Sequence, residues 1–163
     1  TGRLLVLEHV GRKSGARYRT PVNYAQIDGD VFVLAAFGGR THWYRNILAA
    51  PDTAIWLPDG RWLVQAEDAS DDTARLDIVR AVLIGSGFVA PMLGLHPGRM
   101  SDETLDEATA MYRVLRFRLL RKEATPDGPG SLAWIWPAVG VVLLATVALG
   151  VLLRRSALPG ESP

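Results

Sequence analysis

The stretch GRKSGARYRTP, which runs from Gly11 to Pro21, is a basic turn set between two apolar segments. The segment before it, residues 3–10, is dense in leucine and valine and predicts a buried strand. The segment after it, residues 18–27, predicts a second strand, in which Pro21 indicates an edge position or a bulge. Gly11 and Gly15 let the backbone bend between the two segments. We therefore expect a pair of strands joined by a turn that carries positive charge.

The same turn has the chemistry of an anion site. It concentrates cations, a hydroxyl group and a flexible backbone in Arg12, Lys13, Ser14, Gly15, Arg17 and Arg19. Backbone N–H groups beside guanidinium and ammonium groups bind phosphate or carboxylate well. A solvated basic hairpin without a ligand is an equally common use of such residues. The spacing alone leaves both interpretations open.

The rest of residues 1–122 predicts an α+β fold with an antiparallel sheet. Hairpin and turn signals indicate further strands over residues 31–37, 53–57, 61–67 and 114–121. Capping residues indicate short helices that begin after Thr41, after Ser70 and Asp71, and after Ser101. Residues 88–100, rich in glycine and proline, are expected to form an irregular loop. About six strands joined mainly by hairpins can close into a barrel.

A second region follows this domain. Residues 123–131 are a linker rich in proline and glycine, residues 132–153 carry no charge, and residues 154–163 form a short polar tail. At about 1.5 Å per residue, the uncharged run Leu132–Leu153 is long enough for a bilayer core of about 30 Å. It therefore predicts a single transmembrane helix in contact with membrane lipid, with a buried core helix as the less favoured alternative. The flanking arginines leave its orientation unsettled.

Composition narrows the classes of function. The 163 residues include no cysteine, which excludes disulfides, thiolate catalysis and thiolate metal sites. His9, His42 and His96 lie far apart without metal-ligand spacing, so no metal site is expected. The cations of residues 113–122 suit a strand beside anionic lipid better than a nucleic-acid surface, and no nucleic-acid partner is expected. The chain starts at Thr1 rather than Met, from which we expect an incomplete N-terminus.

The stretch from Gly11 to Pro21 resembles the signature of the deazaflavin-dependent nitroreductase family, which includes F420H2-dependent quinone reductases. Members are small split β-barrel proteins that use coenzyme F420. Their GRKSG turn is followed by a hairpin, a glycine-containing strand end and an aromatic helix. Here these features are Asp28-Gly29, then Phe37-Gly38-Gly39, then the run HWYRNI from His42 to Ile47. The resemblance covers residues 4–67 well and the final strand loosely.

The resemblance implies a role for each matching residue. Arg12, Lys13, Ser14 and Gly15 would hold the phosphate and anionic tail of the cofactor; Thr20, Pro21 and Val22 would line the deazaflavin ring; Trp43, Tyr44 and Asn46 would lie over the phosphate-ribityl region. Arg19 joins this set because the family's arginine three residues after Gly15 is Tyr18 here. Asn23, Ala36 and His42 would lie on the acceptor side. Core packing is the alternative for Tyr44, and no catalytic proton donor is assigned.

The implied function is a membrane-tethered reductase that transfers a hydride from reduced F420 to a planar acceptor such as a quinone. A non-catalytic module that binds F420, or FMN as in related split-barrel oxidases, is the first alternative. A structural adaptor whose barrel binds nothing is another. Because F420 is made and reduced in the cytosol, the globular domain would face the cytoplasm at the cell membrane. The sequence leaves the oligomeric state open, with a homodimer as one option.

Overall fold

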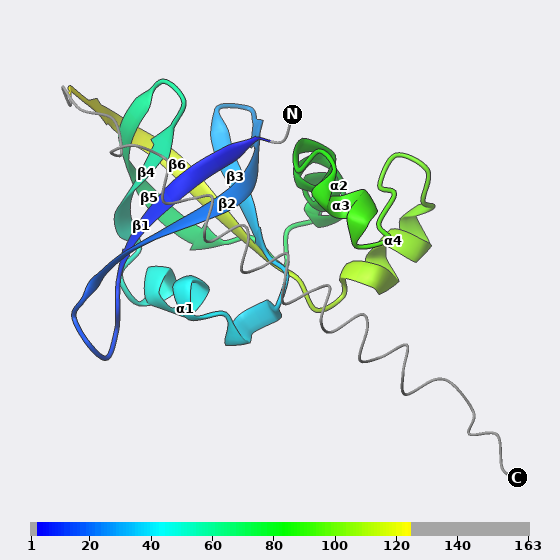
Figure 1. Ribbon diagram of the computed structural model, residues 1–163, viewed down its shortest axis with the longest axis horizontal. Helices are drawn as coiled ribbons and strands as arrows, with labels where there is room; N and C mark the ends of the chain where they lie inside the picture. The colour runs from blue at the N-terminus through cyan, green and yellow to red at the C-terminus, as the bar shows by residue number, and fades with distance from the viewer. Residues whose placement is uncertain (1–2, 125–163) are drawn as a thin grey trace, which may run out of the picture. The chain divides into compact units, whose positions relative to one another are not determined.

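Six antiparallel strands form a closed barrel in the computed structural model, which describes residues 3–124 (Figure 1). The strands are β1 (Leu4–Val10), β2 (Arg17–Ile27), β3 (Asp30–Ala35), β4 (Asp52–Leu57), β5 (Gly60–Asp68) and β6 (Arg113–Glu123). Around the barrel they follow the order β1-β2-β3-β6-β5-β4. The antiparallel α+β barrel expected from the hairpin signals is confirmed, and each expected strand is present.

The first half of β2 has a free edge. Along one side, β2 pairs with β1 from Arg17 to Asn23, whereas on its other side only Tyr24–Ile27 pairs with β3. Pro21 lies in the half with one neighbour, in register with Val6. A proline has no N–H to donate, so an unpaired edge tolerates it. The edge expectation for Pro21 is confirmed, and the pairing with β1 shows no bulge there.

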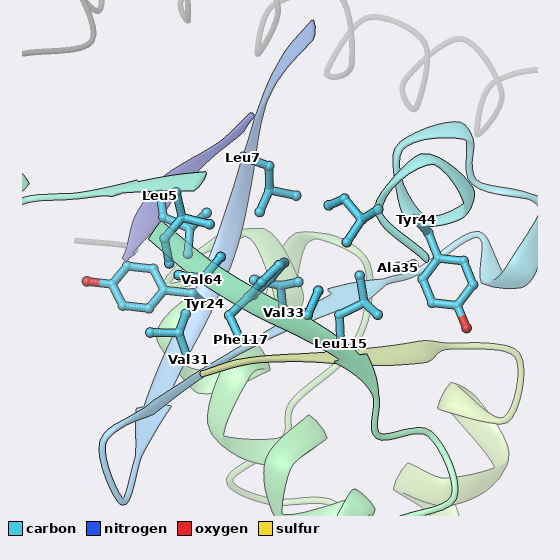
Figure 2. Packing of buried hydrophobic residues seen from close by; sticks show 13 residues of the cluster. Leu5, Leu7, Tyr24, Val31, Val33, Ala35, Tyr44, Val64, Leu115 and Phe117 are labelled. Atoms are coloured by element: carbon cyan, nitrogen blue, oxygen red, sulfur yellow. The ribbon is translucent and has the colours of Figure 1, made fainter. Parts of the chain in front are cut away.

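The barrel interior is the main hydrophobic core (Figure 2). Alternate residues of each strand point inward, so β1 contributes Leu5 and Leu7 and β6 contributes Leu115 and Phe117. These four side chains are at most 1% exposed. Burying each side chain of this size stabilises the fold by roughly 1.5–3 kcal/mol. At one end of the cluster, helix α1 (His42–Ala49) adds Tyr44 and covers the barrel.

A second core lies on the outer face of the barrel. Three helices, α2 (Arg75–Gly85), α3 (Val89–Met92) and α4 (Asp102–Thr109), gather on one side, away from α1 (Figure 1). Val79 and Val82 of α2 share a buried cluster with Phe32 and Val114 of the sheet. Strands β3 and β6 therefore bury residues on both faces.

Helix α1 begins directly after Thr41 as expected, but the Thr41 side chain makes no capping hydrogen bond. Three further local expectations were wrong. The helix expected after Ser70 and Asp71 begins at Arg75 without a side-chain cap, because the Ser70 hydroxyl is engaged by Asp68 and by the Val114 backbone N–H.

The second concerns β3, which ends at Ala35 and not at residue 37, because Gly38 has φ +66° and begins a 3₁₀ turn, η1 (Gly38–Arg40). The third is the loop 88–100, which contains the short helix α3. The Ser101 cap is confirmed, since its hydroxyl accepts the Thr104 N–H.

Within residues 3–124 the structure contains no helix that is both long and apolar enough to cross a membrane. The expected span 132–153 and the polar tail 154–163 lie outside the described residues, as does most of the linker 123–131.

Candidate functional site

The turn between β1 and β2 is held closed by its own backbone. Gly11 N donates to Ala16 O at 2.7 Å, and Gly15 N donates to Gly11 O at 2.8 Å. Gly15 has φ +66°, a conformation that favours glycine. A Cβ on Gly11 would lie 2.4 Å from Ser14 Oγ and 2.9 Å from the Tyr18 ring. Both glycines are therefore needed for the turn to project its cations outward.

A cavity of about 320 Å³ lies between this turn and α1. It is lined by His9, Gly11, Arg12, Lys13, Ser14, Tyr18, His42 and Asn46. Five of these residues were expected at the site from the sequence. The structure thus brings together the GRKSG turn and the aromatic helix, which are separated by two strands in the chain.

Asn46 fastens the turn to the helix. Its Oδ1 accepts hydrogen bonds from the backbone nitrogen of Arg12 at 3.3 Å and from Arg12 Nη1 at 3.0 Å. Asn46 is buried, whereas Arg12 is exposed. One end of the guanidinium group is therefore fixed, and its remaining N–H groups face outward, where they can donate to a ligand.

His9 forms the floor of the cavity. Its Nε2 lies 3.0 Å from Thr20 Oγ1, its Nδ1 lies 3.2 Å from Asn46 Nδ2, and the Tyr18 ring stacks on it with centroids 5.5 Å apart. Burial lowers the pKa of His9 and so favours the neutral form of its ring. Sequence reasoning placed His9 on a strand but gave it no role. Continuing the inward alternation of Leu5 and Leu7 by one step would have found it.

The cavity is lined by cationic side chains and by no anionic one. Neither Arg12 nor Lys13 forms an ion pair with any residue in the part of the chain that the structure describes, and the lining contains no carboxylate. Both cations are exposed at the mouth of a concave site beside the Ser14 hydroxyl. This arrangement suits an anion such as a phosphate, which can accept several charge-assisted hydrogen bonds.

The other site residues expected from the resemblance are not among the residues that line this cavity. On β2, Thr20 and Val22 face the barrel interior, in register with Leu7 and Leu5. The side chains that alternate with them face outward: Arg19, Pro21 and Asn23. Arg19 Nη2 donates to Glu8 Oε1 at 3.2 Å on that outer face. Neither Asn23 nor the half-buried Ala36 lines the cavity, so their contacts with an acceptor stay predictions.

The two aromatic residues of α1 pack inward. Trp43 is half-buried against the barrel core, and Tyr44 is 5% exposed within it. The Tyr44 hydroxyl donates to Asp68 Oδ2 at 2.5 Å. Burial and this hydrogen bond raise the pKa of Tyr44 to about 12. The position of Tyr44 favours the core-packing alternative over direct contact with a cofactor.

Comparison with known proteins bears on the same segment of the chain. The sequence model of the family described as "F420H(2)-dependent quinone reductase" matches residues 1–83. A curated Mycobacterium tuberculosis protein, Rv3178, is named for the same activity and is 41% identical over 76 residues. That match covers 44% of this chain and 64% of Rv3178, so the chain spans less than two thirds of this relative.

Solved structures support the fold. The crystal structure of Rv2991 from M. tuberculosis, a conserved hypothetical protein, matches with a TM-score of 0.55 and 17% identity over 74% of this chain and 75% of that one. A structure titled F420-H2 dependent reductase (FDR-A) matches with a TM-score of 0.51 and 16% identity over 71% of this chain and 94% of the other. At these identities the likeness shows a shared barrel fold alone.

Proposed function

Because the chain belongs to the F420H2-dependent quinone reductase family, we propose that it binds reduced F420 and passes a hydride to a planar acceptor such as a quinone. The observation that carries the proposal is the cavity with two cations, Arg12 and Lys13, that have no carboxylate partner within residues 3–124. F420 carries a phosphate and a glutamate chain, which are the anions such a site would bind.

The residues present fit the phosphate end of this cofactor. Arg12 and Lys13 would neutralise its charge, and the Ser14 hydroxyl would donate a hydrogen bond. A volume of about 320 Å³ is at the low end for a ligand pocket, so we assign it to the phosphate region and not to the whole cofactor. The ring is expected along Thr20–Val22, where the free edge of β2 leaves backbone groups available.

The protein would contribute binding, orientation and shielding from water. The bound cofactor supplies the hydride, and together with one proton this converts a quinone to a hydroquinone. Arg12, held by Asn46, would fix the phosphate end in one position. Val22 and the half-buried Trp43 pack against the barrel core and would limit water on the inner side of β2.

The proposal extends to the membrane. The uncharged run Leu132–Leu153 supports a single-pass helix, which would hold the reductase beside an acceptor dissolved in lipid and raise its effective concentration. The globular domain would then face the cytoplasm. Protease treatment of intact cells should cleave a tag placed after residue 163. A tag that is cleaved only after the cells are opened contradicts this orientation.

The decisive experiment follows the oxidation of F420H2 by the purified full chain, with and without menaquinone. We expect menaquinone to accelerate the oxidation. Equal rates with and without it would contradict quinone reduction. Fluorescence titrations with F420 and with FMN complete the test, because tight F420 binding without oxidation by any acceptor favours the non-catalytic module. Binding of neither cofactor would leave the structural adaptor.

A further inference from the structure

A continuous series of hydrogen bonds runs from the basic turn to the inner face of β2. Arg12 donates from its backbone nitrogen and from Nη1 to Asn46 Oδ1, at 3.3 and 3.0 Å. Asn46 Nδ2 lies 3.2 Å from His9 Nδ1, and His9 Nε2 lies 3.0 Å from Thr20 Oγ1. Asn46 and His9 are 6% and 7% exposed, so the middle of the series is shielded from bulk water.

The series has one direction because its first member can only donate. Arginine has no acceptor on its guanidinium group, so the side-chain oxygen of Asn46 faces Arg12 and the NH2 group faces His9. His9 Nδ1 must then accept. A neutral imidazole that accepts at Nδ1 carries its proton on Nε2, and this N–H donates to Thr20 Oγ1.

The series of hydrogen bonds ends at the hydroxyl group of Thr20. Its oxygen accepts from His9, so its hydrogen must point to a different acceptor, and none is found among residues 3–124. Thr20 is half-buried on the inner face of β2, at the half of the strand that has a free edge. A ligand lying along this half of β2 could accept a hydrogen bond from this hydroxyl, whose rotation is restricted because its oxygen already accepts from His9.

We infer that His9 is a positioning residue, which holds the Thr20 hydroxyl as a hydrogen-bond donor to the cofactor ring and couples it to Arg12 at the phosphate end. The inference rests on the proposed function, because the ligand it requires is F420. A phosphate that fixes Arg12 also fixes Asn46 and His9, and thereby the donor at the other end of the series. Binding of the phosphate end of the cofactor and orientation of its ring are then coupled.

Protonation of His9 would break the series. A cationic imidazole has two N–H donors, so Nδ1 would face the NH2 group of Asn46 without accepting from it. The other titratable groups that line the cavity are Tyr18 on β2, Arg12 and Lys13 in the turn, and His42 at the start of α1. Burial lowers the pKa of His9 and so keeps the ring in the neutral form that the series needs.

The first test reads the His9 tautomer without any ligand. Long-range ¹H–¹⁵N spectra of the ¹⁵N-labelled full chain at pH 7.5 distinguish a protonated from an unprotonated ring nitrogen, and loss of one signal pair in a His9→Phe sample assigns it. We expect Nε2–H with an unprotonated Nδ1. An Nδ1–H tautomer or a cationic ring would overturn the inference, whether or not the chain binds F420.

The second test is a double-mutant cycle on F420 affinity, measured by ligand fluorescence. Thr20→Val should weaken binding by about threefold to tenfold, and Thr20→Ser, which keeps the hydroxyl, should restore most of it. In a His9→Phe background, adding Thr20→Val should have little further effect. An equal effect of Thr20→Val in both backgrounds would show that His9 does not position the hydroxyl. Absence of F420 binding by the wild-type chain would instead overturn the proposed function.

Discussion

Two basic regions look alike in the sequence and differ in the structure. The turn between β1 and β2 presents Arg12 and Lys13, whereas strand β6 presents Arg116, Arg118 and Lys122. These three β6 cations are paired with carboxylates of neighbouring strands and turns. Arg116 contacts Asp30 at 2.5 Å and Glu67 at 3.1 Å, Arg118 contacts Glu67, and Lys122 contacts Asp59 at 3.0 Å. Within the described residues, the two turn cations have no such partner.

The comparison shows that the role of a basic run depends on whether carboxylates lie opposite its cations. The β6 cations brace strands that are adjacent in the barrel, and their charge is largely balanced in place. They present less positive potential to anionic lipid than the sequence alone suggested. The turn cations instead have their charge available to a ligand, which is why the proposed site rests on them.

Removing Lys13 should give the largest effect. We expect Lys13→Ala to weaken F420 binding by about tenfold to a hundredfold, because charge-assisted hydrogen bonds contribute about 1.5–3 kcal/mol. Lys122→Ala, a matched loss of charge from the paired region, should change the affinity by less than about twofold. Fluorescence titration measures both, with thermal unfolding as a check on folding. Equal losses in the two variants would erase the distinction between the regions.

A change in ionic strength should have the second largest effect on F420 affinity. Raising ionic strength from about 0.1 M to about 1 M shortens the screening length from about 10 Å to about 3 Å, so F420 affinity should fall severalfold. The decline should be shallower in Lys13→Ala, because one of the screened charges is gone. The same titration performed across a salt series gives both slopes. A decline that is identical in the two proteins would mean that Lys13 does not face the ligand.

Removing a paired cation should act on stability and not on binding. Arg116→Gln leaves Asp30, whose side chain is 19% exposed, without its charged partner. We expect the free energy of unfolding to fall by about 1 kcal/mol in urea denaturation, with F420 affinity unchanged. Lys13→Ala should show the opposite pattern. If Arg116→Gln weakened binding while unfolding stayed the same, β6 would belong to the site.

Lowering the pH should protonate His9, which lines the same cavity as Arg12 and Lys13. The pKa of His9 is lowered by burial, so the folded state favours the neutral ring. The associated stability is therefore fully present above the unfolded pKa of about 6.5, and it is lost as pH falls toward the lower folded value. Urea denaturation between about pH 7.5 and pH 5 should show this decline, and His9→Phe should remove that part of it. Tyr18, Arg12, Lys13 and His42, which line the same cavity, are unchanged in that variant.

The sequence predicted what local patterns determine. The hairpin at Asp28-Gly29 follows from two residues that adopt positive φ, 51° and 89°, and the strand positions follow from turns of this kind. The basic turn and its neighbour α1 were also expected. What the sequence did not reveal depends on distant partners. Ser70 does not cap a helix because it bonds Val114, and Tyr44 lies in the core because Asp68 accepts its hydroxyl.

His9 is the residue of the site to which the sequence alone gave no role. Its partners are Thr20 on β2 and Asn46 on α1, which follows β3, so no local pattern distinguishes it from any strand histidine. Only the closed barrel brings these residues together. The available charge of the turn was visible in the sequence, whereas the neutral network beneath it required the structure.

The free edge of β2 also bears on whether a second chain can pair with this one. A strand with unpaired backbone groups can recruit a strand from another chain and start aggregation. Pro21 interrupts that half of β2 and lacks the N–H that an added strand would need, and charged Arg17 and Arg19 flank it. The same edge can therefore offer carbonyl and amide groups to a small flat ligand while it resists strand addition by a second chain.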